Sequence, residues 1–111
     1  MVNAGAKPLV LTEAREQRMT NYAQGRRAEY RTMRLLESLG YICTRSASSK
    51  GPWDVVGVSS SDVVLVQVKT GKSGPSRAEV EELRELKRPQ NCRIFLHWWK
   101  ERTSAPEVTE L

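Results

Sequence analysis

Residues 53–70, WDVVGVSSSDVVLVQVKT, restrict the fold of this chain more than any other stretch of the sequence. Two Val-rich runs flank a Ser-Ser-Ser-Asp turn at 59–62. Alternating runs of β-branched residues on either side of such a turn are typical of paired strands. The sequence therefore predicts a β-hairpin or meander over 53–70, and the rest of the chain must pack around it.

An amphipathic helix is predicted before this hairpin, in the segment TNYAQGRRAEYRTMRLLESLG. Asn21 is the expected N-cap, with Gln24 three residues later as in a capping box, and Gly40 is the expected C-terminal stop. Apolar or small residues recur at helical spacing. The predicted buried stripe consists of Ala28, Thr32, Leu35, Leu36 and Leu39.

A second helix is predicted after the hairpin, in SRAEVEELREL, with Ser76 as N-cap, Glu79 completing a capping box, and Pro89 ending the helix. Its predicted apolar stripe consists of Ala78, Val80, Leu83 and Leu86. YICTRS and CRIFLHWWK read as strands, and APEVTEL reads as a last edge strand or a tail. The order α-β-β-β-α-β predicts an α/β (α+β) fold with a mixed β-sheet flanked by helices.

The length of 111 residues fits one domain, which we expect to occupy residues 21–111. Residues 1–20 are weakly patterned and fit either a short helix after Thr12 or a flexible, charged N-terminal arm. No apolar stretch suits a membrane span or a signal peptide, so we expect a cytoplasmic protein without a membrane partner. Cys43 and Cys92 lie in strand-like segments and are expected in the core, although a catalytic Cys paired with His97 stays open as a weaker alternative.

The formal net charge is +5, from 18 Lys or Arg against 13 Asp or Glu, and the excess lies in the first half of the chain. Most of the basic residues are Arg, whose forked donors suit phosphate, so a nucleic acid is the expected partner. The candidate phosphate contacts on the first helix are Arg26, Arg27, Arg31 and Arg34, and those on loops are Lys50, Lys72 and Ser73. Ordinary solvated surface is the alternative for each of them.

Three polar residues interrupt the apolar runs of the hairpin. Gln67 and Lys69 share one face of their strand, and Asp54 at the start of the neighbouring strand can reach the same place. Carboxylate, amide and carbonyl oxygens suit Mg²⁺, and a Lys beside a water held by that cation would favour its deprotonation. The sequence therefore predicts a divalent cation site with phosphodiesterase chemistry, against the alternative of a buried Asp54–Lys69 ion pair with Gln67 at a sheet edge.

The order of elements and the spacing of Asp54 and the Gln67-Val68-Lys69 triplet resemble the PD-(D/E)XK nuclease superfamily, which has a restriction-endonuclease-like core. The segment GRRAEYRTMRLLESLGYICTRSASSKGPWDVV is similar more narrowly to archaeal-type Holliday junction resolvases. This resemblance implies Mg²⁺ as the cofactor, with Mn²⁺ as a substitute, and branched DNA as the substrate.

The resemblance also assigns roles to individual residues. It implies that Asp54, Gln67, Lys69 and Glu29 are catalytic, that Asp54, Gln67, Glu29 and the backbone carbonyl of Val68 ligate the metal, and that Arg45, Ser48 and Ser49 contact DNA. Two positions depart from the family pattern. Trp53 separates Pro52 from Asp54, and Gln67 stands where the family has its second acid, which should weaken the affinity for Mg²⁺.

Two functions therefore remain open: a metal-dependent endodeoxyribonuclease acting on branched DNA, and a non-catalytic DNA-binding module with a degenerate site. An RNA-directed enzyme on the same fold is a less favoured third. Because a four-way junction is nearly two-fold symmetric, we expect a homodimer, with Trp98 or Trp99 and the second helix as candidate contacts.

Overall fold

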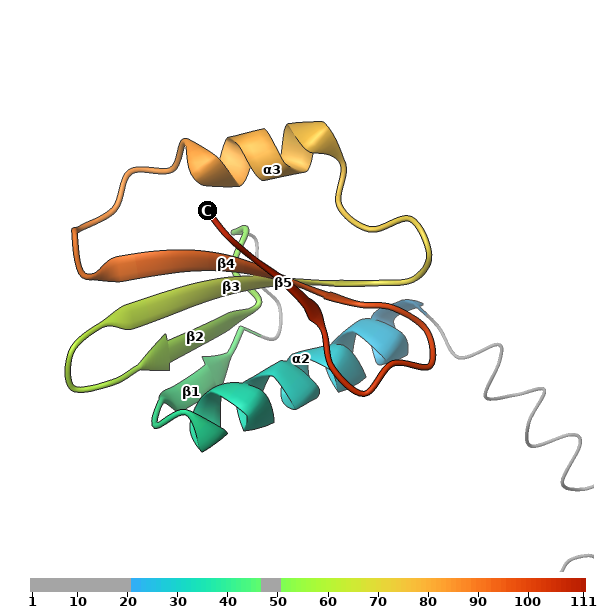
Figure 1. The fold of residues 1–111 in the computed structure, drawn as a ribbon, viewed down its shortest axis with the longest axis horizontal. Helices are drawn as coiled ribbons and strands as arrows, with labels where there is room; N and C mark the ends of the chain where they lie inside the picture. The colour runs from blue at the N-terminus through green and yellow to red at the C-terminus, as the bar shows by residue number, and fades with distance from the viewer. Residues whose placement is uncertain (1–20, 47–50) are drawn as a thin grey trace, which may run out of the picture.

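The computed structural model describes residues 21–46 and 51–111 and has the predicted mixed architecture (Figure 1). Its elements, in chain order, are α2 (Asn21–Ser38), β1 (Ile42–Arg45), β2 (Val55–Val58), β3 (Val63–Thr70), α3 (Arg77–Arg84), β4 (Cys92–Trp99) and β5 (Glu107–Glu110). The predicted arm of residues 1–20 lies outside the described residues, so that prediction stays a prediction.

The described strands form one sheet in the order β1-β2-β3-β4-β5. β1, β2 and β3 form an antiparallel meander, as residues 53–70 predicted, with Val55 opposite Val66. β3 and β4 are parallel because the chain crosses over through α3 between them. β5 pairs antiparallel with β4 at the far edge, which confirms the edge strand and makes β4 an interior strand of the sheet.

α2 covers one face of the sheet. Leu36 packs against Val55, Val64 and Val66, the inward side chains of the hairpin. The helix ends at a Schellman motif in which Tyr41 N–H bonds Leu36 O and Gly40 N–H bonds Glu37 O. Gly40 adopts φ 98°, a conformation that favours glycine, so the predicted stop is confirmed.

Two details of the first predicted helix were wrong. Asn21 is itself helical and does not precede the helix as a cap. Leu39 is 67% exposed because it lies beyond the last helical residue, where the chain has already turned away from the sheet. The buried stripe therefore ends at Leu36.

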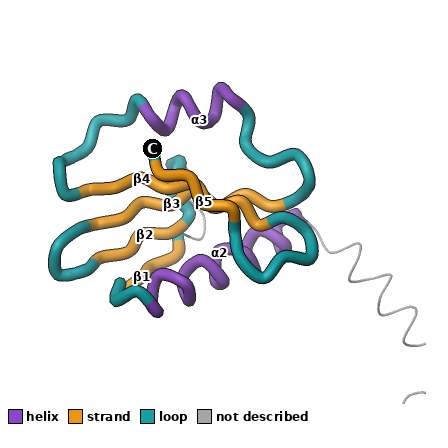
Figure 2. The backbone as a smooth tube through the Cα atoms, in the orientation of Figure 1, coloured by secondary structure: helices purple, strands orange, loops and turns teal. Residues whose placement is uncertain are grey.

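α3 covers the opposite face of the sheet, as Figures 1 and 2 show. Leu83 packs against Ile94 and Leu96 of β4. The predicted capping box is present, with Ser76 as N-cap and Glu79 as its partner. Pro89 does not end the helix, because α3 stops at Arg84 and an irregular segment leads to β4.

The interior between α2 and β4 contains a buried polar chain. Trp99 Nε1 donates to Thr32 Oγ1 over 2.8 Å, and Thr32 Oγ1 lies 3.1 Å from His97 Nδ1. The indole nitrogen can only donate, so Thr32 Oγ1 is the acceptor of that bond, while the direction of the bond between Thr32 and His97 depends on the imidazole tautomer. Burial lowers the pKa of His97 to about 4, so this imidazole is neutral at physiological pH.

Trp99 was one of the two tryptophans predicted as candidate dimer contacts. It is only 6% exposed and therefore belongs to the core. The two cysteines are free thiols: Cys92 is buried, and Cys43 is half-buried with its Sγ directed at the carbonyl of Met33. In the described part of the chain, neither helix has the length and apolarity that crossing a bilayer demands.

Candidate active site

Asp54 lies where β2 and β3 separate. β2 begins two residues later than predicted, at Val55, and the backbone N–H of Asp54 donates to Val66 O over 2.9 Å. The pairing of β2 with β3 ends at Val55 and Val66, and beyond that point the Asp54 Oδ2 atom accepts a hydrogen bond from Val68 N–H over 2.8 Å. The side chain thus continues the ladder and fixes a carboxylate beside the middle of β3.

Gln67 lies on β3 within this opening between the strands. Its Oε1 atom is buried and has no hydrogen-bond partner in the described structure. Gln67 also lines a cleft of about 480 Å³ beneath α3, with Gly51, Pro52, Glu79, Glu82, Leu83 and Leu86 around it. A buried amide oxygen without a donor is costly, so its position favours a ligand that accepts its lone pairs.

Lys69 follows on the same face of β3 and makes an ion pair with Glu79 of α3. Asp54 is not part of any ion pair in the described structure, so the alternative of a direct Asp54–Lys69 bridge is not what the protein forms. The sequence pointed to Glu79 only as a cap residue. Glu79 lies at the start of the helix that follows β3, and this position was the only sequence signal that its side chain could lie near the end of β3.

Glu29 reaches the same end of the sheet from α2. Its Oε1 accepts a hydrogen bond from Arg45 Nη1 over 3.0 Å, and the Arg45 guanidinium lies 4.8 Å from the centre of the Tyr30 ring. Both Glu29 and Arg45 are largely buried. Arg45 is therefore held by Glu29 at the end of β1, next to the position where Asp54 begins the opening.

The carboxyl groups of the site carry a burial cost. Burial raises the pKa of Asp54, an effect that the Val68 N–H and the Lys69 ammonium offset only in part. Burial also raises the pKa of Glu29, with a further increase from the charge of Asp54 against the opposing hydrogen bond from Arg45. The two carboxylates are thus close enough to interact.

The sign of this effect decides how stability depends on pH. A carboxyl whose pKa is raised by folding stabilises the protein fully below its unfolded pKa, and this contribution is lost as the pH rises through the folded pKa. Because burial raises the pKa of Asp54, the charged form of this carboxyl destabilises the folded protein. A bound cation would relieve that cost.

The residues present fit a divalent cation, although they provide fewer charges than a common metal site. Among residues 21–46 and 51–111, no group of three His, Cys, Asp or Glu side chains is close enough to hold a metal ion. Asp54 supplies one carboxylate, however, and Gln67 supplies an amide oxygen without another partner. Hard cations accept oxygen ligands of both kinds.

A second groove, of about 180 Å³, continues from the end of β3 toward the first turns of α2. Its lining includes Arg27, Arg31, Thr70, Gly71, Trp99, Lys100 and Arg102. The Arg31 guanidinium lies 4.1 Å from the centre of a Trp99 ring, and its Nη2 donates to Thr103 O over 3.0 Å. Arg31 is therefore held in one orientation at the groove.

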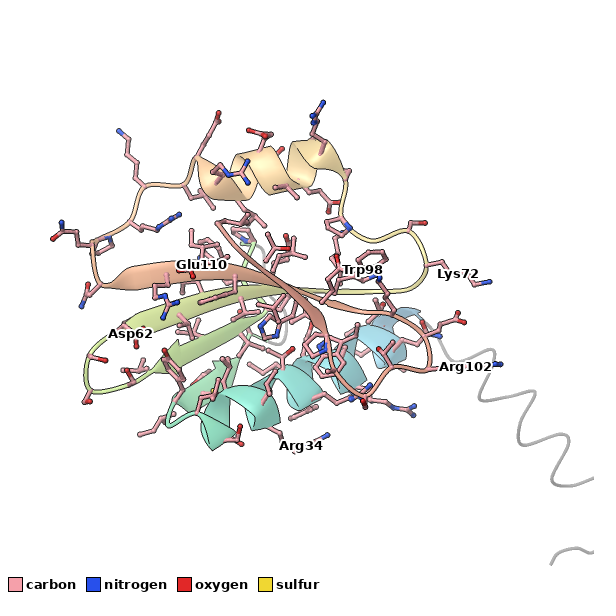
Figure 3. All side chains as sticks on the ribbon, in the orientation of Figure 1. Arg34, Asp62, Lys72, Trp98, Arg102 and Glu110 are labelled. Carbon is pink, nitrogen blue, oxygen red and sulfur yellow. The ribbon has the colours of Figure 1, made fainter. Side chains whose placement is uncertain are left out.

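The other predicted DNA-contacting residues are more dispersed. Arg26 is exposed and lies over the Tyr22 ring. Lys72 projects from the loop after β3, at the same end of the molecule as Arg102 (Figure 3). Ser48, Ser49 and Lys50 lie outside the described residues. The sequence did not single out Lys100 or Arg102, because their turn joins the groove only through the pairing of β4 with β5.

Comparison with solved structures identifies the architecture. The structure of Archaeoglobus fulgidus Hjc, a Holliday junction resolvase from an archaeal hyperthermophile, matches with a TM-score of 0.59 and 21% sequence identity, covering 78% of this chain and 72% of the other. This chain has a resolvase-like nuclease fold. No family model matches the sequence, and no curated protein matches it. The matching fold is the mixed five-stranded sheet with one helix on each face that is described above.

Proposed function

We propose that this protein is a divalent-metal-dependent endodeoxyribonuclease that hydrolyses phosphodiester bonds in branched DNA. The observation that carries the proposal is the buried Gln67 Oε1, which has no partner in the described structure and lies beside the strand opening that Asp54 occupies. The resolvase-like fold supports the same conclusion. Mg²⁺ is the expected cation, with Mn²⁺ as a substitute.

Each residue of the site has a role in this proposal. Asp54, Gln67 and the backbone carbonyl of Val68 would hold the cation, with Glu29 as an additional acidic group nearby. The bound cation supplies the activation of water and neutralises phosphate charge. The ammonium of Lys69 stabilises the negative charge that develops on the phosphate as a water oxygen attacks phosphorus and the bond to the leaving oxygen breaks.

A cleavage assay tests this function directly. Labelled four-way junction, flap, linear duplex and RNA substrates are incubated with the protein in Mg²⁺, in Mn²⁺ and in a chelator. We expect cation-dependent cleavage, strongest on the junction or the flap and absent with chelator. If only the RNA is cleaved, the substrate is RNA and the DNA part of this proposal is wrong. Binding to DNA without cleavage of any substrate would reject the proposal.

The second candidate function is a DNA-binding module without catalysis. It is favoured by one observation, the lack of three clustered acidic, His or Cys ligands among the described residues. Such a module would bind junction DNA equally well with and without Mg²⁺. The metal titration in the same assay therefore distinguishes the two functions.

We expect Arg31→Ala to weaken DNA binding by roughly 3- to 10-fold and to lower the salt dependence of binding by about one counterion. Arg31 lines the second groove and is held in place by Trp99, so its guanidinium is prepared for a phosphate. Fluorescence anisotropy across a salt series measures both quantities. The matched control is Arg34→Ala on the exposed part of α2. Equal effects of the two substitutions would contradict a specific role for the groove.

We also propose that the protein acts as a homodimer, because two symmetric cuts in a junction need two sites related by a two-fold axis. Trp99 is unsuited to the interface because it is buried against α2. Trp98 is half-buried and remains a candidate together with α3. Light scattering at micromolar concentration should give twice the mass of one chain. A monomer, with or without junction DNA, would contradict this proposal.

A further inference from the structure

Lys69 makes its ion pair with a residue from a different layer of the fold. Its Nζ atom contacts Glu79 Oε2, which lies on the first turn of α3, and the Lys69 side chain is 29% exposed. A Lys side chain has a flexible four-carbon stem and loses much rotamer freedom when its ammonium is held in one place. The position of the ammonium is therefore set by where Glu79 lies.

Glu79 is itself fixed by the start of α3. Its Oε1 accepts a hydrogen bond from Ser76 N–H over 2.9 Å, while its own N–H donates to Ser76 Oγ over 3.1 Å. The two carboxylate oxygens have separate partners, one on the helix cap and one on Lys69. These contacts lower the pKa of Glu79, so its charge is secure at neutral pH.

The loop between β3 and α3 is also anchored to the sheet. Trp98 Nε1 donates to Gly71 O over 2.8 Å. Gly74 has φ 66° and approaches the same indole so closely that a Cβ at this position would lie 2.8 Å from the ring. The loop that leads into α3 is thus held against β4 at Gly71 and Gly74, a few residues before Glu79.

The surroundings of Lys69 give this arrangement a consequence for catalysis. Lys69 is close enough to Asp54 for its charge to act on that carboxyl, so it lies between two acidic groups. Without Glu79 the ammonium would move toward Asp54 and compete with a cation for the same oxygens. Glu79 provides the counter-charge that keeps Lys69 near the site but away from Asp54.

On the basis of the proposed nuclease function, we propose that Glu79 is a positioning residue that holds Lys69 for catalysis. The capping box makes this role separable from helix stability, because Gln at the same position still accepts the hydrogen bond from Ser76 N–H but offers Lys69 no charge. Glu79→Gln should therefore alter the reaction while leaving α3 folded.

The test combines kinetics with chemical labelling of lysines. In Glu79→Gln we expect kcat for junction cleavage to fall by about tenfold, with KM unchanged or lower because a negative charge has left the cleft. The unfolding temperature should match that of the wild type. Acetic anhydride, followed by mass spectrometry, should modify Lys69 at a rate that differs from the wild-type rate, relative to the exposed Lys72, because the ammonium has left its place beside residue 79.

Glu81→Gln is the matched control, since Glu81 lies two residues further along α3 and pairs with Arg84 on the exposed side. It should leave kcat, KM and Lys69 labelling unchanged. If Lys69 labelling and kcat in Glu79→Gln equal the wild-type values, the inference is overturned while the nuclease function stands. If the wild-type protein cleaves nothing, the proposed function fails first, and the catalytic role of Glu79 fails with it.

Discussion

Asp54→Asn should reduce metal-dependent cleavage by on the order of 10³-fold while leaving the protein folded. The Asp54 carboxylate is the charged oxygen ligand of the site, and the neutral amide cannot replace its charge. The amide oxygen can still accept the hydrogen bond from Val68 N–H, so the junction of β2 and β3 is preserved. Single-turnover cleavage of labelled junction DNA measures the loss.

Thermal unfolding adds a readout that does not depend on activity. Because burial raises the pKa of Asp54, the ionised carboxylate destabilises the cation-free protein at neutral pH. Asp54→Asn should therefore raise the unfolding temperature in chelator, and Mg²⁺ should stabilise the wild type but not the variant. Equal stabilisation of both proteins by Mg²⁺ would show that the cation binds elsewhere. The control is Asp62→Asn on the β2–β3 turn, which should keep the Mg²⁺ response.

Gln67→Glu should lower the Mg²⁺ concentration needed for half-maximal cleavage by about tenfold. The substitution adds a second carboxylate at an oxygen that is buried and has no partner in the described structure. In the cation-free protein the added charge lies near Asp54 and should lower the unfolding temperature. A Mg²⁺ titration of the cleavage rate, with thermal unfolding at each concentration, measures both effects.

Gln67→Ala completes this comparison because it removes the oxygen without adding charge. It should increase the Mg²⁺ requirement, so the three side chains are expected to rank as Glu, Gln and Ala in order of rising requirement. An identical Mg²⁺ dependence for all three would mean that Gln67 is not a ligand. In that case the buried amide would need another partner, such as a base of the DNA.

The main elements of the fold could be predicted because their signals are local. Two Val-rich runs around a Ser-rich turn specify the hairpin, the Ser76–Glu79 capping box starts α3, and Gly40 ends the first helix. Leu39 and Pro89 were misplaced because α2 and α3 stop earlier, at Ser38 and Arg84, and local patterns do not fix how far a helix extends. Propensity alone does not contain that information.

The site was predictable only in part. The period of two in a strand places Gln67 and Lys69 on one face whatever the surroundings, and the hairpin brings Asp54 beside them. The second groove, lined by Arg27, Arg31 and Arg102 among others, was harder to predict from the sequence. The sequence predicted Arg31 as one of several candidate phosphate contacts on the first helix, but it did not predict that Arg31 stacks on Trp99, a residue 68 positions later in the chain.

The amino-acid sequence by itself determined which segments become strands and helices and which polar residues share a face, since these depend on neighbours within a few positions. Only the tertiary structure decided which acid pairs with Lys69 and which oxygen is left without a partner. Both depend on where α3 returns over the sheet after the β3–β4 crossover. Contacts between distant segments are set by the packing of the whole core, and the spacing of residues along the chain does not encode them.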